Sequence, residues 1–374
     1  MCIVSHRLGG YDGVSVEAAK WHWAFLELGW TVTRAAGFFS GARSATDVEV
    51  AGLWAPYFGG APPPPDTEVI NHLCRTNDLL VLDNVGSLPT TPHTAVEFEI
   101  AALRAGLPTI VRHHDPPWQL SSFTPSATAG FPLTDARMLH VTINRLTEGE
   151  FRQLNPALVA ADAVTTIYNT VDRAGLRQGD GAAPRRRMAI PDGDLLLAHP
   201  ARNIDRKNIP AALDLAGALH RRTGRRIHYW LTDPTGELDA LPTGVTAHRG
   251  HVDRAADLYA AADIVALTST WEGWGLPVVE SAAARRPAVT CSYPVLAEIN
   301  QIGIVTVDHG DVDTLVDLLT EPARYTAFTM ANERAAAALD IRRLPTILGQ
   351  AATRAIMLMN PGRQPTPPAS GSHC

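Results

Sequence analysis

The fold is decided by residues 263–280, which read DIVALTSTWEGWGLPVVE. The apolar run 264–267 predicts a buried strand, and a loop with two glycines follows it. Leu276 and Pro277 then open an alanine-rich helix, because proline is favoured in a first turn, where no amide donor is needed. A strand, a glycine loop and a helix N-terminus in this order present free N–H groups and the positive end of a helix dipole. The stretch therefore predicts an anion site of the phosphate-binding kind.

Two glutamates distinguish this loop from an ordinary phosphate loop. Glu272 lies in the loop and Glu280 lies one turn into the helix, with seven residues between them. A carboxylate repels a bound phosphate, so both side chains are better suited to accept hydrogen bonds from hydroxyl groups. A ligand that carries both phosphates and hydroxyls is a sugar nucleotide. The neighbouring Trp271 and Trp274 fit a stacking platform for a sugar or base and core packing equally well.

Composition narrows the class of protein. The 374 residues exceed one ordinary core and predict two domains of roughly 150 residues each. A hydrophobic content of 45% with 19% charged residues is typical of a soluble globular protein, and a net charge of −6 without a basic stripe argues against nucleic acid as a partner. No run approaches the ~20 apolar residues of a membrane span, and no signal peptide precedes the first strand. We expect a cytoplasmic protein without stable membrane association. Its thiols are expected to be reduced at Cys2, Cys74, Cys291 and Cys374.

Strands alternate with helices through both halves of the chain. The predicted strands are 2–5, 31–35, 78–83, 108–112, 138–143 and 164–168 in the first half, and 195–198, 227–231, 245–248, 264–267, 288–291 and 304–307 in the second. Such alternation implies right-handed crossovers and mostly parallel sheets covered on both faces. The fold class is therefore α/β, with two doubly wound Rossmann-like domains that face a cleft. Ligands are expected at the carboxyl ends of the strands.

The domain boundaries follow from composition. We predict a first domain over 1–180, a linker rich in Gly, Pro and Arg over 181–193, and a second domain over 194–340. A C-terminal helix over 341–360 can pack back on the first domain. The tail 361–374 is predicted to be disordered.

Four short elements resemble the retaining glycosyltransferases of family 4, which have the GT-B fold. In chain order they are Gly9-Gly10-Tyr-Asp-Gly13 after the first strand, His113-His114-Asp115 after the fourth strand, Arg202 with Lys207 five residues later, and the E-x7-E stretch 272–280. The resemblance covers nearly the whole chain. SHRLGGYDGVSVEAAKW and HHDPPWQ carry a narrower similarity, to the subgroup that includes mannosylglucosylglycerate synthases.

The resemblance assigns roles to these residues. Arg202 and Lys207 would offset the charge of a leaving pyrophosphate without a metal. Glu280 would accept from the ribose hydroxyls and Glu272 from hydroxyls of the transferred sugar, and His114 would contact the donor sugar. The implied catalytic residues are His114, Arg202, Lys207 and Glu272, and the implied donor-binding residues are Gly9, Gly10, Gly13, Arg202, Lys207, Glu272, Gly273, Trp274, Gly275, Leu276 and Glu280.

The first domain is expected to bind the acceptor. The candidates on that side are His113, Asp115 and Trp118, with the loops 54–65 and 116–132. The doubled histidine leaves open which ring faces the cleft, although His114 is the better choice. An alternative takes His113, His114 and Asp115 as metal ligands, but adjacent side chains on a strand point to opposite faces and no further ligand cluster is visible.

We expect neither a metal nor a cofactor. Asp192-Gly-Asp194 and Asp311-Val-Asp313 fit the D-x-D pattern of metal-dependent transferases, but the first lies in the linker turn and the second at a helix start, where Asp is favoured as a cap. No acidic residue lies at the offset of a nicotinamide dinucleotide site, so a dehydrogenase is not expected.

The leading hypothesis is a retaining glycosyltransferase. It would move a hexose from a UDP- or GDP-sugar to a small hydroxylated acceptor by a metal-independent front-face mechanism. Two alternatives stay open, a GT-B sugar-nucleotide epimerase and a non-catalytic sugar-nucleotide-binding partner of another transferase. The base, the sugar, the acceptor and the oligomeric state are left open by the sequence.

Overall fold

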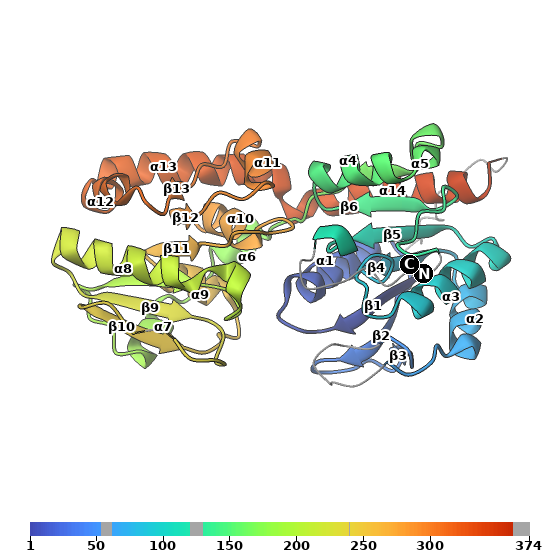
Figure 1. Ribbon diagram of the computed structural model, residues 1–374, viewed down its shortest axis with the longest axis horizontal. Coiled ribbons are helices and arrows are strands. Elements are labelled where there is room, and N and C mark those ends of the chain that lie inside the picture. The colour runs from blue at the N-terminus through green and yellow to red at the C-terminus, as the bar shows by residue number, and fades with distance from the viewer. Residues whose placement is uncertain (54–61, 120–129, 239, 362–374) are drawn as a thin grey trace, which may run out of the picture. The chain divides into compact units, whose positions relative to one another are not determined.

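The chain forms two compact units (Figure 1). The computed structural model describes residues 1–53, 62–119, 130–238 and 240–361. The first unit comprises Met1–Thr170 with Arg342–Cys374, and the second comprises Val171–Ile341.

The first unit is built on a seven-stranded parallel sheet of order β3-β2-β1-β4-β5-β6-β7. Its strands are β1 Cys2–Leu8, β2 Thr33–Phe39, β3 Val48–Glu49, β4 Leu80–Asp83, β5 Thr109–His113, β6 Leu139–Thr142 and β7 Val164–Thr166. Its helices are α1 Gly13–Glu27, α2 Thr67–Thr76, α3 Pro92–Ala105, the 3-10 turn η2 Pro117–Gln119, α4 Arg145–Leu154, α5 Pro156–Ala160 and α14 Leu344–Met359. Apolar residues of β1, β4 and β5 pack with those of α2 and α3 in one buried cluster. Helix α14, the last helix of the described residues, contacts α1, β5 and β6 (Figure 1, red helix).

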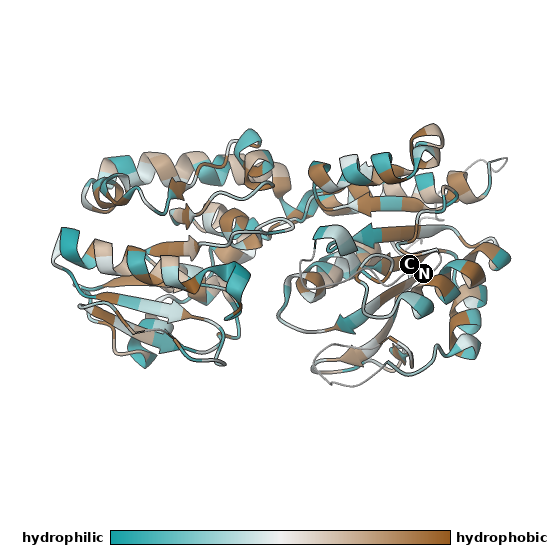
Figure 2. Ribbon diagram, in the orientation of Figure 1, coloured by the Kyte–Doolittle hydropathy of each residue, from teal (hydrophilic) through white to brown (hydrophobic). Residues whose placement is uncertain are grey.

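The second unit carries a six-stranded parallel sheet of order β10-β9-β8-β11-β12-β13. Its strands are β8 Leu195–His199, β9 Ile227–Leu231, β10 Val245–Arg249, β11 Ile264–Leu267, β12 Ala288–Thr290 and β13 Val307–Asp308. Its helices are α6 Arg173–Leu176, α7 Ala182–Arg187, η3 Asp205–Lys207, α8 Ile209–Thr223, α9 Ala255–Ala261, α10 Leu276–Ala283, α11 Leu296–Gln301, α12 Val312–Thr320, α13 Pro322–Ala335 and η4 Ala336–Leu339, with η5 Ile341–Arg343 at the boundary of the units. The apolar faces of α8 and α12 cover the strands, and in Figure 2 these helices alternate between hydrophobic and hydrophilic residues while β11 is hydrophobic throughout.

The two predicted parallel, Rossmann-like sheets are confirmed, with differences at their margins. The strand β3 was not expected. The strand predicted over 304–307 is shorter, because the side chain of Asn332 donates to the Val305 carbonyl and accepts from the Val305 amide, both at 2.8 Å, and so occupies the groups that a neighbouring strand would use.

The division between the units does not coincide with the predicted linker over 181–193. It lies between Thr170 and Val171, and the linker segment belongs to the second unit. There α7 contacts α9, and Arg185 donates to the carbonyl of Ala261 at 2.9 Å and pairs with Asp263. Arg185 therefore joins α7 to α9, while Arg186 and Arg187 are exposed.

Some predictions fall on residues that the structure does not describe. Residues 362–374 of the predicted tail lie outside the described residues, as do 54–61 and 120–129 of the two predicted acceptor loops. Among the described residues, no helix has both the length and the apolar character that crossing a membrane requires.

Candidate functional site

The turn between β11 and α10 needs a glycine at its last position. Gly275 has φ of +100° and precedes Leu276, the first residue of α10. A Cβ at Gly275 would lie 2.3 Å from the hydroxyl of Tyr293, a residue that is itself buried. The left-handed backbone and the close approach both exclude a larger side chain. The chain thereby enters α10 with the first-turn amides at the carboxyl end of β11.

Glu272 is the centre of a compact charged cluster in this turn. The residue is 8% exposed, and its Oε1 accepts hydrogen bonds from Lys207 Nζ and, at 2.5 Å, from Ser269 Oγ. Its Oε2 accepts from Arg206 at 3.2 Å, and the same guanidinium nitrogen donates to the Trp271 carbonyl at 2.9 Å. Burial alone would raise the pKa of Glu272, but the charges of Lys207 and Arg206 outweigh it and hold that pKa below its usual value.

The loop after β8 brings Lys207 to this position. η3 ends at Lys207, and Asn208 takes a left-handed conformation with φ of +49° before α8 begins. Thr268, at the end of β11, donates through its hydroxyl to the carbonyls of Lys207 at 3.1 Å and Asn208 at 3.0 Å. Burial lowers the pKa of Lys207, although the charge of Glu272 opposes that shift. The predicted Lys and Glu motifs, far apart in sequence, therefore form one site.

Arg206 was missed by the sequence analysis, which considered only Arg202 and Lys207. Arg202 is exposed, and its charge acts through space to lower the pKa of Lys207. Arg206, by contrast, contacts Glu272 directly. The adjacent Arg-Lys pair in the sequence was the available signal, but only the tight turn of η3 directs both side chains to the same carboxylate.

His199 lies close enough to this cluster for the charges of Lys207 and Glu272 to act on it. It is fully buried at the end of β8, its Nδ1 lies 2.9 Å from the hydroxyl of Tyr229, and its Nε2 has no hydrogen-bond partner among the described residues. Burial, reinforced by the charge of Lys207, lowers the pKa of His199 to about 3. The imidazole is therefore neutral at pH 7 and adds no further positive charge beside Lys207.

The second glutamate has a different environment. Glu280 is half-buried on α10, and its Oε2 accepts a hydrogen bond of 2.6 Å from the phenol of Tyr259 on α9. Trp274 is 2% exposed and packs in the interior, which favours the core-packing interpretation of that ring over a stacking platform.

In the first unit the ends of β4 and β5 are tied together around His114. Asn84 has φ of +65°, and its Oδ1 accepts from the amides of His114 and Asp115, both at 3.1 Å. Its Nδ2 donates to Asp115 at 2.9 Å. His114 Nε2 lies 2.9 Å from Asp83 Oδ1, so the carboxylate fixes which ring nitrogen carries a proton. Asp83 and Asn84 were also missed, although their position directly after an apolar strand was visible in the sequence.

A buried, charge-balanced network lies behind Asp83. The fully buried Arg112 donates to Glu17 at 3.1 Å and to Asn169 at 2.8 Å, and another of its nitrogens lies 3.6 Å from Asp83. Lys20 donates to the other oxygen of Glu17 at 2.6 Å. Two cations and two carboxylates are thus paired, which is how proteins tolerate buried charge.

His113 and Trp118 lie to one side of this network. His113 is fully buried, its Nε2 lies 3.0 Å from His140 Nδ1, and its ring packs 4.1 Å from that of Phe151. Burial holds the pKa of His113 well below its usual value. The ring therefore packs beneath α4, whereas the His114 ring, which is 5% exposed, lies against Asp83. Trp118 is partly exposed and donates to Glu150 at 2.8 Å.

The glycine loop after β1 has packing roles. Gly9 has φ of +78°, and a Cβ there would lie 2.2 Å from the carbonyl oxygen of Ser40. Gly10 follows it, and Gly13 is the first residue of α1, which Asp12 caps by accepting from the Ser15 amide at 3.2 Å.

The predicted site residues fall into two sets. Lys207, Glu272, Gly275 and Glu280 gather at the carboxyl ends of β8 and β11 in the second unit, together with Arg202, Gly273, Trp274 and Leu276. The other set, Gly9, Gly10, Gly13, His113, His114, Asp115 and Trp118, belongs to the first unit.

Neither D-x-D sequence forms a pair of free carboxylates. Asp311 caps α12 by accepting from the Thr314 amide at 3.0 Å, as predicted, and Asp194 accepts from His228 at 3.0 Å. In the part of the chain that the structure describes, no group of three or more His, Cys, Asp or Glu residues is arranged to hold a metal ion.

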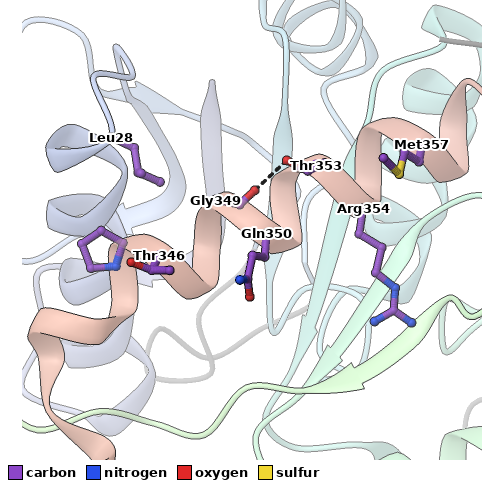
Figure 3. Close-up of a pocket in the computed structure, with 8 residues that line it drawn as sticks. Leu28, Thr346, Gly349, Gln350, Thr353, Arg354 and Met357 are labelled. Carbon is purple, nitrogen blue, oxygen red and sulfur yellow. Dashed lines mark hydrogen bonds between the residues drawn. The ribbon is translucent and has the colours of Figure 1, made fainter. Parts of the chain in front are cut away.

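A surface pocket of about 520 Å³ lies on the first unit, away from both sets of side chains. Figure 3 shows it along one side of α14, with Leu28 opposite Thr346 and Gly349. None of the residues that line it is a predicted site residue, so the pocket carries no part of the site.

Comparison with known proteins supports an assignment by class. Residues 194–322 match the family described as "Glycosyl transferases group 1". The mannosylglucosylglycerate synthase of Thermotoga maritima is 22% identical over 371 residues, which cover 83% of this chain and 85% of the relative.

Solved structures share the fold. Anabaena HepE, solved in complex with UDP and glucose, superposes with a TM-score of 0.67 at 16% identity, covering 94% of this chain and 98% of HepE. WaaG, a glycosyltransferase involved in lipopolysaccharide biosynthesis, superposes with a TM-score of 0.65 at 13% identity, covering 96% of this chain and 100% of WaaG. The chain therefore has the two-sheet GT-B fold of these structures, and its residues 194–322 are similar to the group 1 glycosyltransferases.

Proposed function

We propose that this protein is a retaining glycosyltransferase that moves a hexose from a UDP- or GDP-sugar to a small hydroxylated acceptor. The observation that carries the proposal is the cluster in which Lys207, Arg206 and Ser269 converge on Glu272 at the start of α10. In this cluster, positive charge and a hydroxyl-accepting carboxylate lie beside the N-terminus of a helix at the carboxyl edge of a parallel sheet, where nucleotide ligands bind.

The cations would stabilise the leaving nucleoside diphosphate. As the bond between the sugar carbon and the phosphate oxygen breaks, negative charge grows on the phosphate. Lys207, Arg206 and the exposed Arg202 supply three positive charges near that position, and the N-terminus of α10 adds the positive end of a helix dipole. A single preorganised donor of this kind typically contributes about 3 kcal/mol to the barrier reduction. Side chains can therefore supply the stabilisation that a metal supplies in other transferases.

Retention follows from attack on the face that the phosphate leaves. In this front-face mechanism the acceptor oxygen bonds to the sugar carbon while the acceptor proton passes to the departing phosphate oxygen. Glu272, held ionised by its cations, would accept hydrogen bonds from the hydroxyls of the transferred sugar. We assign His114 to the same reaction from the first unit, where Asp83 orients its ring.

The relatives favour particular substrates for a first assay. HepE was solved with UDP and glucose, which supports a UDP-hexose as the first donor to test. The Thermotoga maritima relative is a mannosylglucosylglycerate synthase, which supports small glycosylated hydroxy acids as the first acceptors, and GDP-mannose as the second donor.

The test incubates the protein with UDP-glucose or GDP-mannose and a panel of such acceptors, and reads the anomeric configuration of the product by proton NMR. We expect transfer with retention, and a loss of at least ~100-fold in the Glu272→Ala and Lys207→Ala variants. The matched control is Arg222→Ala, which removes an exposed cation that pairs with Asp313 in the same unit. An inverted product would refute the mechanism. Epimer formation from UDP-N-acetylglucosamine without acceptor would instead indicate a sugar-nucleotide epimerase.

A further inference from the structure

We propose that Tyr259 is a positioning residue for Glu280, and that through it the site recognises the ribose hydroxyls and rejects deoxyribonucleotides. The inference rests on the proposed function, because it takes Glu280 as the carboxylate that receives the ribose of the nucleotide. It adds a residue that no sequence motif indicated.

The contact itself is short and sheltered. Tyr259 is 1% exposed on α9, and its hydroxyl donates to Glu280 Oε2 at 2.6 Å. A hydrogen bond of this length from a neutral O–H to a carboxylate is charge-assisted and roughly twice as strong as one between neutral groups. Burial, with the nearby charge of Glu280, holds the pKa of Tyr259 well above its usual value, so the phenol keeps its proton.

Tyr259 is itself held in place from the far end of α10. Arg286 follows that helix and donates to the carbonyls of Tyr259 at 2.8 Å and Ala260 at 2.9 Å. The last turn of α9 is therefore joined to α10 twice, through Arg286 at the end of the helix and through the Tyr259 phenol at Glu280. The direction of the Glu280 carboxylate is fixed before a nucleotide arrives.

The phenol determines what Glu280 can bind. An ionised carboxylate offers about four acceptor positions on two oxygens, and Tyr259 occupies one of them on Oε2. Tyr259 donates to the carboxylate without neutralising or protonating it, so the inference requires only that a ligand hydroxyl donate to the same carboxylate. A ribose supplies vicinal hydroxyl donors, whereas a deoxyribose leaves one acceptor position unsatisfied. A site that is built to bond a hydroxyl discriminates strongly against a ligand that lacks it.

The experiment measures binding of UDP, 2′-deoxy-UDP and 3′-deoxy-UDP by titration calorimetry to the full chain and to Tyr259→Phe. The guanosine series replaces these nucleotides if GDP binds more tightly than UDP. In the wild type we expect at least one deoxy form to bind about 10-fold or more weakly than the ribonucleotide. In Tyr259→Phe we expect binding of the ribonucleotide to weaken by a similar factor and binding of the deoxy form to change little. The ratio of the two dissociation constants should therefore fall toward one.

The matched control is Thr320→Val, which removes an exposed hydroxyl that donates to the Val316 carbonyl on α12 in the same unit. It should leave the ratio unchanged. If Tyr259 serves packing alone, Tyr259→Phe should weaken binding of the ribonucleotide and of the deoxy form equally, and that result would overturn the inference. So would a full effect of Tyr259→Phe in a Glu280→Gln background. Failure of the wild type to bind either UDP or GDP would refute the proposed function itself, whereas binding without ribose discrimination would refute only this inference.

Discussion

Replacing Glu272 by glutamine tests whether the ion pair at the start of α10 exists in solution and serves the reaction. Glutamine keeps the shape of the side chain but removes the negative charge that faces Lys207 and Arg206. The side chain of Lys207 is only 11% exposed, so its charge would stay buried without its principal counter-ion.

The magnitude follows from that burial. Breaking a buried pair by removing one partner destabilises a protein by about 3–5 kcal/mol. Because Arg206 is about one-third exposed and can turn to solvent, we expect the lower end of that range for Glu272→Gln. Lys207 has a pKa already lowered by burial, and loss of the opposing Glu272 charge would lower it further. The depressed pKa means that stability is lost as the pH falls through it, so the penalty should shrink as the pH rises toward the ordinary lysine value of 10.5.

The double variant Lys207→Met with Glu272→Gln separates stability from function. It removes both charges, so urea unfolding followed by circular dichroism should show most of the lost stability restored. Donor turnover should stay at least ~100-fold below wild type in both variants, because each lacks the carboxylate proposed to accept from the sugar hydroxyls, and the double variant also lacks the Lys207 charge that acts on the phosphate. Surface substitutions usually change the free energy of unfolding by no more than about 0.5 kcal/mol. The reasoning fails if Glu272→Gln has an effect as small as that. It also fails if the double variant recovers turnover.

Three further predictions concern other parts of the chain. Gly275→Ala should destabilise the second unit by about 2–3 kcal/mol in urea unfolding, because of its φ of +100° and the 2.3 Å approach to the Tyr293 hydroxyl, and adding Tyr293→Phe should recover part of that loss. Asp83→Asn should lower donor turnover by about 10- to 100-fold, because it removes the negative charge that lies 2.9 Å from the His114 ring, and should have no such effect in a His114→Ala background. Burial raises the pKa of Glu99 from 4.5 to about 7, so this group stabilises the fold below pH 4.5 relative to neutral pH. After allowance for partial exposure, Glu99→Gln should raise the free energy of unfolding by about 1 kcal/mol at pH 8 and leave it unchanged at pH 4.

The sequence predicted the architecture because its signals are local. The strand over 264–267 coincides with β11, and Gly275 with Pro277 marks the start of α10, since an apolar run, a left-handed glycine and a first-turn proline each act within a few residues. The predicted linker failed for the opposite reason. Arg185 is indistinguishable in sequence from a solvated arginine, and its role appears only when α9 brings the Ala261 carbonyl against it.

The site was predicted only as far as its motifs reach. Glu272 and Lys207 stood out by spacing, whereas Tyr259 has no pattern of its own, and the position of Asp83 at the end of an apolar strand does not reveal its partner. Each acquires a role from a partner on another element, Tyr259 from Glu280 on α10 and Asp83 from His114 after β5. Hydrogen bonds between side chains of different elements depend on tertiary packing, so a local sequence pattern cannot predict them.

The different partners of the two glutamates imply different behaviour when a donor binds. The partners of Glu272 are chiefly cations, and a phosphate that draws Lys207 toward itself weakens its bond to Glu272 and leaves an acceptor position on that carboxylate for a sugar hydroxyl. Glu280 is held by a neutral phenol that a phosphate does not attract, so its direction stays fixed. With seven residues between them in sequence, the two carboxylates would differ under the proposed function, and Glu272 would be the exchangeable one, suited to a sugar whose position changes during transfer. The other is constant and suited to the ribose, which must stay in place while the sugar leaves.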